Sequence, residues 1–213
     1  MAFIFPALIF VVFLFCVAFS YREGMWGNAI TLVNIIIAGL LAVNFWEPLA
    51  RMLEDMLPSF TFVWDMIALW GVFCLSLLVF RTATRGVSKY QVRFKQLHDQ
   101  IGSVVFAVLL GAVMVCFTTM TLHTAPLGRN FLFGGFQPEK KMFFGLAPDI
   151  RWLDVVNKLS TGSLKRWTTR EFDPEAAFID TYANRRQLLE DYAKERKGFS
   201  VQQNDLGSRV PKR

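Results

Sequence analysis

The chain has 213 residues, of which 54% are hydrophobic and 19% charged, and its net charge is +6. Soluble helices carry charges on nearly every turn, so this composition argues against an ordinary soluble globular protein. The charges are also segregated, because residues 1–127 hold only 7 of the 23 Lys and Arg and 6 of the 17 Asp and Glu. The sequence therefore predicts a membrane-embedded part, residues 1–127, and an extramembrane part that follows it.

Several function classes leave a sequence signature that this chain lacks. Its basic residues are scattered and are not interleaved with aromatic ones, so we predict no nucleic-acid partner. We find no nucleophile–base set, phosphate-cradling glycine loop or metal-ligand spacing, and so predict neither an enzyme nor a cofactor or metal. Cys16, Cys74 and Cys116 each fall in an apolar run and are interpreted as small apolar helix residues.

The first two apolar runs, residues 2–20 and 25–46, contain no charged residue. A helix the length of the first run extends about 28 Å, close to the ~30 Å hydrocarbon core of a bilayer, so each run predicts a transmembrane helix. A cleaved signal peptide is the alternative for the first run, although no Lys or Arg precedes it. The short connection Tyr21–Gly24 predicts an antiparallel hairpin.

Asn34 lies in the middle of the second run. An amide at this depth needs a partner, so we interpret Asn34 as a contact between helices, with a transport path as the alternative. Residues 47–55 are predicted to form an acidic loop, because Pro48 and Pro58 are typical of helix ends.

The third predicted span, residues 58–80, contains one charged residue, Asp65. An ionisable residue inside a span is a functional-site candidate, here for a proton or ion relay. The alternative is a boundary position or a structural ion pair.

Residues 81–100 form a basic loop in this prediction. Its cations recur every four residues and its apolar residues, such as Leu97 and Ile101, recur on another side, which predicts an amphipathic helix that contacts anionic lipids at the cytoplasmic surface. The alternative is a loop of extended cationic side chains with no specific lipid partner. Cationic loops stay in the cytoplasm, so both termini are expected outside it. The predicted lipid-facing cations are Arg81, Arg85, Lys89 and Arg93.

The fourth predicted span is residues 101–127, with His123 near its end. We interpret His123 as an interfacial residue, since nothing near it in the sequence completes a metal or catalytic set. The fold class is therefore all-α: a polytopic membrane protein with a bundle of four transmembrane helices and a partly helical C-terminal tail.

The tail, residues 128–198, begins with a predicted loop and a short helix over 149–159, whose apolar side is Ile150, Leu153, Val155 and Val156. Asp173-Pro174-Glu175 predicts the start of a second helix that ends near Lys197. Its docking stripe is Phe178, Tyr182, Leu189 and Tyr192, interrupted by Arg185 and Arg186. We expect this tail to need the membrane part, a second copy or a partner to order, and residues 199–213 to be disordered.

Residues 21–127 have a distinctive layout. It consists of a short first turn, a basic third loop and then an acidic residue followed by small residues at every fourth position. The last feature reads Asp99, Ser103, Ala107, Gly111. This layout resembles the colicin V production (CvpA) family of bacterial inner-membrane proteins. The chain departs from the family pattern at Glu23-Gly24, where Arg-Gly is usual, and at Gly27-Asn28, where the family has an Arg-Glu pair.

The resemblance implies a role in the cell envelope, connected with the export or production of colicin V. Small residues at this spacing line one helix face and let a neighbouring backbone approach closely. The helix-packing candidates are Gly24, Asn34, Asp99, Ser103, Ala107 and Gly111. The leading hypothesis is a non-enzymatic inner-membrane protein that contacts other membrane or envelope proteins, or further copies of itself. The alternatives are a small oligomeric transporter or channel component and a membrane-bound sensor or signalling subunit.

Overall fold

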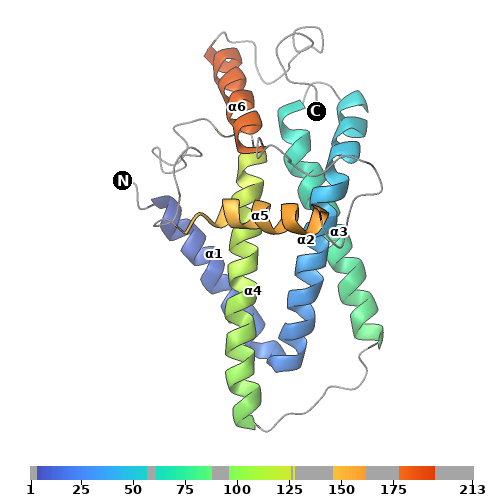
Figure 1. Cartoon of the computed structure of the whole chain (residues 1–213), viewed down its shortest axis with the longest axis vertical. Coiled ribbons are helices and arrows are strands. Elements are labelled where there is room, and N and C mark those ends of the chain that lie inside the picture. The colour runs from blue at the N-terminus through green and yellow to red at the C-terminus, as the bar shows by residue number, and fades with distance from the viewer. Residues whose placement is uncertain are drawn as a thin grey trace.

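The computed structural model describes residues 4–56, 61–87, 96–125, 127, 146–161 and 178–194. Over these residues the protein is all-helical and contains no strand, which confirms the all-α part of the predicted fold class. Helices α2, α3 and α4 run along the long axis, α1 is inclined to them, α5 lies across the bundle and α6 lies at one end (Figure 1). The helices are α1 (Ile4–Ser20), α2 (Gly24–Met56), α3 (Thr61–Val87), α4 (Gln96–Thr124), α5 (Pro148–Thr161) and α6 (Phe178–Lys194), with the short 3₁₀ helix η1 (Tyr21–Glu23) before α2.

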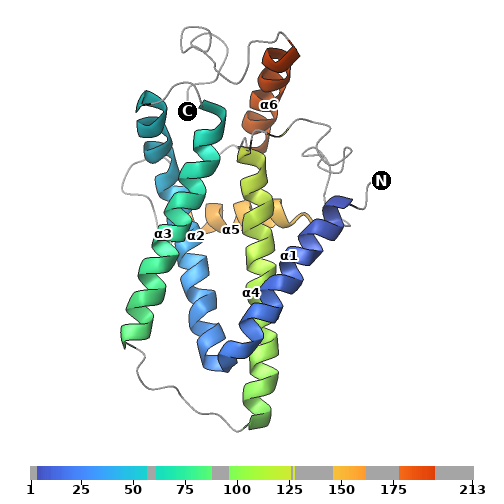
Figure 2. The ribbon, with the colours of Figure 1, turned by 180° about the vertical axis from the view of Figure 1, so that it is seen from behind.

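Three helical stretches are long and apolar enough to cross a membrane: Ile4–Met56, Val63–Gly86 and Gln96–Thr124. The first stretch is interrupted at η1, where the chain reverses direction and α1 leans away from α2 as the second arm of a V (Figure 2). Gly24 makes this reversal possible, because its φ of 75° and ψ of 169° belong to a region open almost only to glycine.

Large apolar side chains remain exposed along α1 to α4. In a soluble protein so much exposed apolar surface would be unfavourable, whereas in a bilayer it faces lipid tails. The exposed apolar residues on these helices include Phe15, Phe19, Val33, Phe45, Leu75, Leu78, Val105 and Leu109.

The acidic loop predicted for residues 47–55 is wrong. α2 continues through Pro48 to Met56, because the last turns bury Ala50 and pack Leu49 and Leu53 against the core. Proline lacks the N–H that would bond to the carbonyl of Asn44, so the helix tolerates one missing hydrogen bond in exchange for this packing. Pro58 lies outside the described residues.

The predicted surface helix over 81–100 is also wrong as a separate element. Arg81 and Arg85 belong to the end of α3, and Leu97 and Ile101 to the beginning of α4, so the connection is at most residues 88–95. Lys89 and Arg93 lie outside the described residues. The helical spacing in this region thus comes from the end of α3 and the beginning of α4, which extend beyond the uncharged parts of these two helices.

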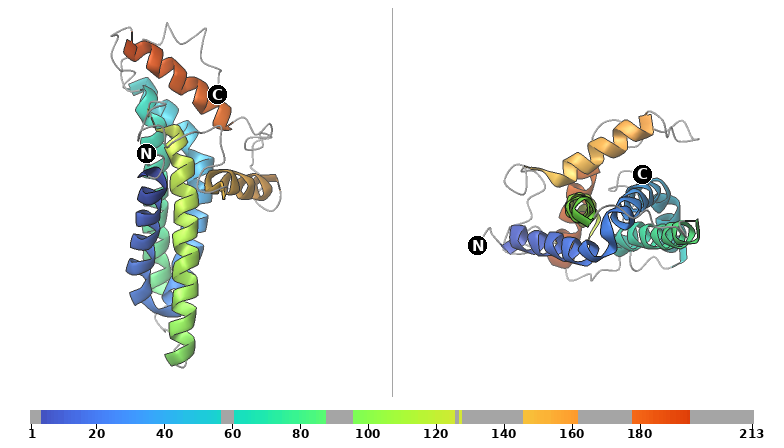
Figure 3. Two further views of the ribbon diagram at one scale, coloured as in Figure 1. Left: turned by 90° about the vertical axis from the view of Figure 1, so that its left-hand side faces the viewer. Right: turned by 90° about the horizontal axis from the view of Figure 1, so that it is seen from below.

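Helix α5 packs on the side of the bundle, across α4 (Figure 3). Its anchor is Trp152, whose ring centroid lies 5.7 Å from that of Phe117 on α4. A Cβ at Gly39 of α2 would lie 2.6 Å from the Trp152 ring, so this glycine makes room for it. Leu153 and Val156 are buried as expected, whereas Ile150 and Val155 of the predicted apolar side are exposed.

Candidate functional site

Two polar sites hold the helices together, one at each end of the bundle. At the first, Asp99 of α4 lies beside the start of α2, and its Oδ1 accepts a hydrogen bond of 3.1 Å from the backbone N–H of Met25. The first N–H groups of a helix have no partner within the helix and attract negative charge, so Asp99 satisfies the end of a neighbouring helix. A Cβ at Gly24 would lie 3.5 Å from Asp99 Oδ2, so the two predicted residues are close neighbours.

Ser103 continues this junction one turn further along α4. Asn28 Nδ2 donates to both the backbone oxygen and the Oγ of Ser103, at 3.2 Å and 3.1 Å. The Ser103 hydroxyl in turn donates to the carbonyl oxygen of Tyr21, at 3.1 Å. Sequence reasoning missed the role of Asn28, which is fully buried; its signal was a polar residue one helical turn after Gly24 in an uncharged run.

Ala107 and Gly111 complete the small-residue stripe, which we define as Ser103, Ala107 and Gly111. All three are buried. A Cβ at Gly111 would lie 2.9 Å from the Phe13 ring and 3.1 Å from a Val17 methyl of α1, which is closer than packed atoms approach. The stripe is therefore already covered within the chain, so it is not a free surface for another protein.

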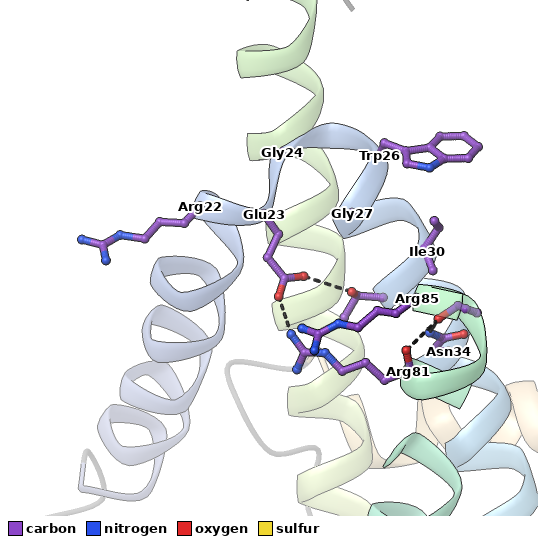
Figure 4. A pocket seen from close by; sticks show the side chains of 11 residues that line it. Arg22, Glu23, Gly24, Trp26, Gly27, Ile30, Asn34, Arg81 and Arg85 are labelled. Carbon is purple, nitrogen blue, oxygen red and sulfur yellow. Dashed lines mark hydrogen bonds and ion pairs between the residues drawn. The ribbon is translucent and has the colours of Figure 1, made fainter. Parts of the chain in front are cut away.

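Asn34 and Arg81 each have a partner on a neighbouring helix (Figure 4). Asn34 Nδ2 donates to Thr84 Oγ1 at 3.0 Å, which joins α2 to α3. Arg81 Nη2 forms an ion pair of 2.5 Å with Glu23 Oε1. The contact of this basic region with anionic lipids stays a prediction.

The second site lies at the opposite end of the bundle, beneath α6. Asp65 of α3 is 1% exposed and forms an ion pair with Arg185 of α6. Tyr182 supports this pair, because its ring lies 5.7 Å from the Arg185 guanidinium and packs against Trp46 of α2. Of the predicted roles, the structure places Asp65 in a structural ion pair.

His123 of α4 is buried at the same end of the bundle as Asp65. Its predicted position at the membrane interface stays a prediction. Its Nε2 lies 2.9 Å from Asp149 Oδ2 at the start of α5, and its Nδ1 lies 3.4 Å from Arg186 Nη2 of α6. Arginine can only donate, so Nδ1 is the acceptor and the hydrogen on Nε2 is donated to Asp149. The histidine thus connects α4 to both tail helices.

These five residues form the buried charge cluster: Asp65, His123, Asp149, Arg185 and Arg186. Buried ions are expensive unless opposite charges neutralise them, and here two carboxylates accompany two guanidinium groups. Sequence reasoning missed the two arginines, although adjacent cations on the apolar side of a helix were a signal that buried acids would meet them. The described residues hold no group of three or more His, Cys, Asp or Glu suited to a metal ion.

Residues 5–134 match the family model described as colicin V production protein. The chain belongs to the colicin V production protein family. The match covers α2 to α4 and all of α1 except its first residue, and it confirms the family resemblance read from Asp99 and the small-residue stripe. Together with its apolar helices, this makes the protein a membrane protein of the colicin V production type. Neither a curated protein nor a solved structure matches the chain.

Proposed function

We propose that this protein is a non-enzymatic scaffold of the bacterial inner membrane that supports envelope integrity or the export of toxins and proteins. In this proposal α1 to α4 span the membrane four times, and the N- and C-termini lie outside the cytoplasm. The tail helices α5 and α6 are the surface that meets other envelope proteins.

The observation that carries the proposal is the buried charge cluster. A tail needed only as a loose extension would not hold Arg185 and Arg186 at 7% and 4% exposure against acids and a histidine of other helices. Such pairing costs desolvation free energy and is best attested where it fixes one arrangement of parts. A fixed tail on a membrane anchor fits a scaffold better than a carrier, since Asp65 and Asn34, the residues that favoured transport, are engaged by Arg185 and Thr84.

The orientation is tested by cysteine labelling. Cys16, Cys74 and Cys116 are replaced by serine, and one cysteine is introduced at Asp180 of α6 or at His98 of α4. Both positions are exposed, and they lie at opposite ends of the molecule. A membrane-impermeant maleimide should label Asp180→Cys in intact spheroplasts and His98→Cys only after lysis. The reverse pattern would overturn the orientation, and labelling of both from outside would overturn the four-span count.

The role is tested by complementation. In cells that lack the protein, leakage of a periplasmic enzyme and export of a secreted reporter are measured with the wild type, Arg185→Leu and Lys158→Gln restored to equal membrane abundance. Arg185→Leu should fail to restore the phenotype because its tail is released. Lys158→Gln should restore it, because Lys158 is exposed on α5 and its ion pair with Asp154, four residues earlier on the same helix, does not join the tail to α1–α4. Full restoration by an Arg185→Leu protein whose tail is shown to be released would reject the scaffold.

A further inference from the structure

A polar pocket opens between the η1 turn, the first turns of α2 and the end of α3 (Figure 4). Its volume of about 430 Å³ falls within the range of small-ligand sites. Three of its lining side chains are arginines and one is a glutamate. We call it the basic pocket, and the charged residues that line it are Arg22, Glu23, Arg81 and Arg85.

The one acid in the basic pocket is fully engaged. Glu23 pairs with Arg81 through Oε1 and accepts a hydrogen bond of 3.2 Å from Thr31 through Oε2. Among the described residues, neither Arg22 nor Arg85 has a carboxylate partner. The pocket therefore carries an excess of positive charge that an anion would neutralise.

The guanidinium groups of Arg81 and Arg85 project from α3 toward Glu23, whereas Arg22 points away from them (Figure 4). Residues four apart share one helix face, so their like charges repel unless an anion lies between or beside them. Guanidinium groups bind phosphate oxygens through two parallel hydrogen bonds. The chemistry that best fits this pair is therefore a phosphate ester.

Beside the charged groups the lining is mixed, with the polar side chains of Thr31, Asn34 and Thr84 and two apolar ones. Trp26 and Ile30 line the pocket on the α2 side, and Trp26 is 38% exposed. Exposed apolar residues continue from the pocket along both helices, with Val33 on α2 and Leu78 on α3. A ligand with a phosphate head and a long apolar portion would contact both the arginines and these apolar residues, whereas a free phosphate would contact only the arginines.

We propose that the basic pocket binds the phosphate of an anionic phospholipid, with the acyl chains lying along Val33 and Leu78. Placing this lipid in the cytoplasmic leaflet rests on the orientation proposed above. Binding itself does not, because it can be measured on the purified full-length protein in detergent. Failure of lipid binding and failure of the labelling test are thus separate outcomes.

The test measures binding of phosphatidylglycerol by native mass spectrometry, with phosphatidylcholine as the zwitterionic comparison. Wild type should prefer phosphatidylglycerol. Arg85→Gln should weaken this binding about five- to tenfold, because a charge-assisted hydrogen bond is lost. Arg85→Lys should recover part of it, since the charge returns without the paired donors. Lys158→Gln removes the same charge from the exposed side of α5 and should leave binding within about twofold of the wild type.

Glu23→Gln distinguishes a binding site from a merely structural cluster. It removes the competing anion, so phosphatidylglycerol should bind at least as tightly as to the wild type. If these charges were only structural, Glu23→Gln and Arg85→Gln should both weaken lipid binding. Equal binding of the two lipids, or no effect of Arg85→Gln in a protein with wild-type helicity, would overturn the proposal. Displacement of the lipid by glycerol 3-phosphate at a similar concentration would overturn the lipid assignment in favour of a soluble phosphate ester.

Discussion

Asp65 of α3 and Arg185 of α6 are 120 positions apart in the sequence, yet they form an ion pair with side chains only 1% and 8% exposed. This pair, with the neighbouring contacts of His123, fastens the tail to the membrane part. Burial of a charge is tolerated only next to an opposite charge, so either residue alone would be strongly unfavourable.

Arg185→Leu should therefore lower the free energy of unfolding by about 3–5 kcal/mol, because it leaves Asp65 buried without its charge partner. The measurement is denaturant unfolding of the purified protein in micelles, and the readout is the rate at which a protease cleaves α6. The double variant Asp65→Leu/Arg185→Leu should regain most of the loss. A loss in the double variant equal to the sum of the two single losses would show that the residues are not coupled.

His123→Leu should loosen both tail helices at once, since His123 contacts Asp149 of α5 and Arg186 of α6. Leaving these buried polar groups unsatisfied costs about 1–3 kcal/mol. Hydrogen exchange should speed up over both α5 and α6. The matched control is His98→Leu, which changes the other histidine, exposed at the start of α4. Faster exchange in α5 alone would contradict the link to Arg186.

Gly24→Ala should destabilise the protein by about 1–3 kcal/mol, because its backbone conformation is open almost only to glycine. The cost comes from the backbone, since the nearest atom to an added Cβ is Asp99 Oδ2 at an ordinary 3.5 Å. Gly71→Ala is the control: an added Cβ there meets nothing within 4 Å, and alanine in a helix should stabilise by up to ~1 kcal/mol. The thermal unfolding temperature should fall in Gly24→Ala and rise in Gly71→Ala.

Gly111→Leu should push α1 away from α4, because even a Cβ at this position lies 2.9 Å from the Phe13 ring. Overpacking of this kind costs about 1–3 kcal/mol. Spin labels on α1 and α4 should report an increased separation. Ala112→Leu adds the same side chain at the next residue, which is exposed, and should leave the separation unchanged. An unchanged separation in Gly111→Leu would show that α1 does not lie on the stripe.

Much of the fold follows from the sequence alone. Uncharged runs of spanning length predict helices because an isolated segment in lipid must satisfy its own backbone hydrogen bonds. The family pattern at Asp99, Ser103, Ala107 and Gly111 also identified one packed face without a structure. The tail helix α5 was expected within two residues of its ends, Pro148 and Thr161.

Helix boundaries were harder to predict. Pro48 and the cations Arg81 and Arg85 suggested loops, but the helices continue through them because core packing at Ala50 and the Glu23–Arg81 pair outweigh local preferences. Local signals act over one or two turns, whereas these contacts join residues from different helices.

The sequence by itself determined that this is a helical membrane protein of the colicin V production family, because apolar length and residue spacing are local properties. Only the tertiary structure decided where its charges go. Asp65, His123, Asp149, Arg185 and Arg186 come from four helices, and no local rule pairs them. Their burial is possible because the fold brings opposite charges within hydrogen-bonding reach, and that condition exists only in three dimensions.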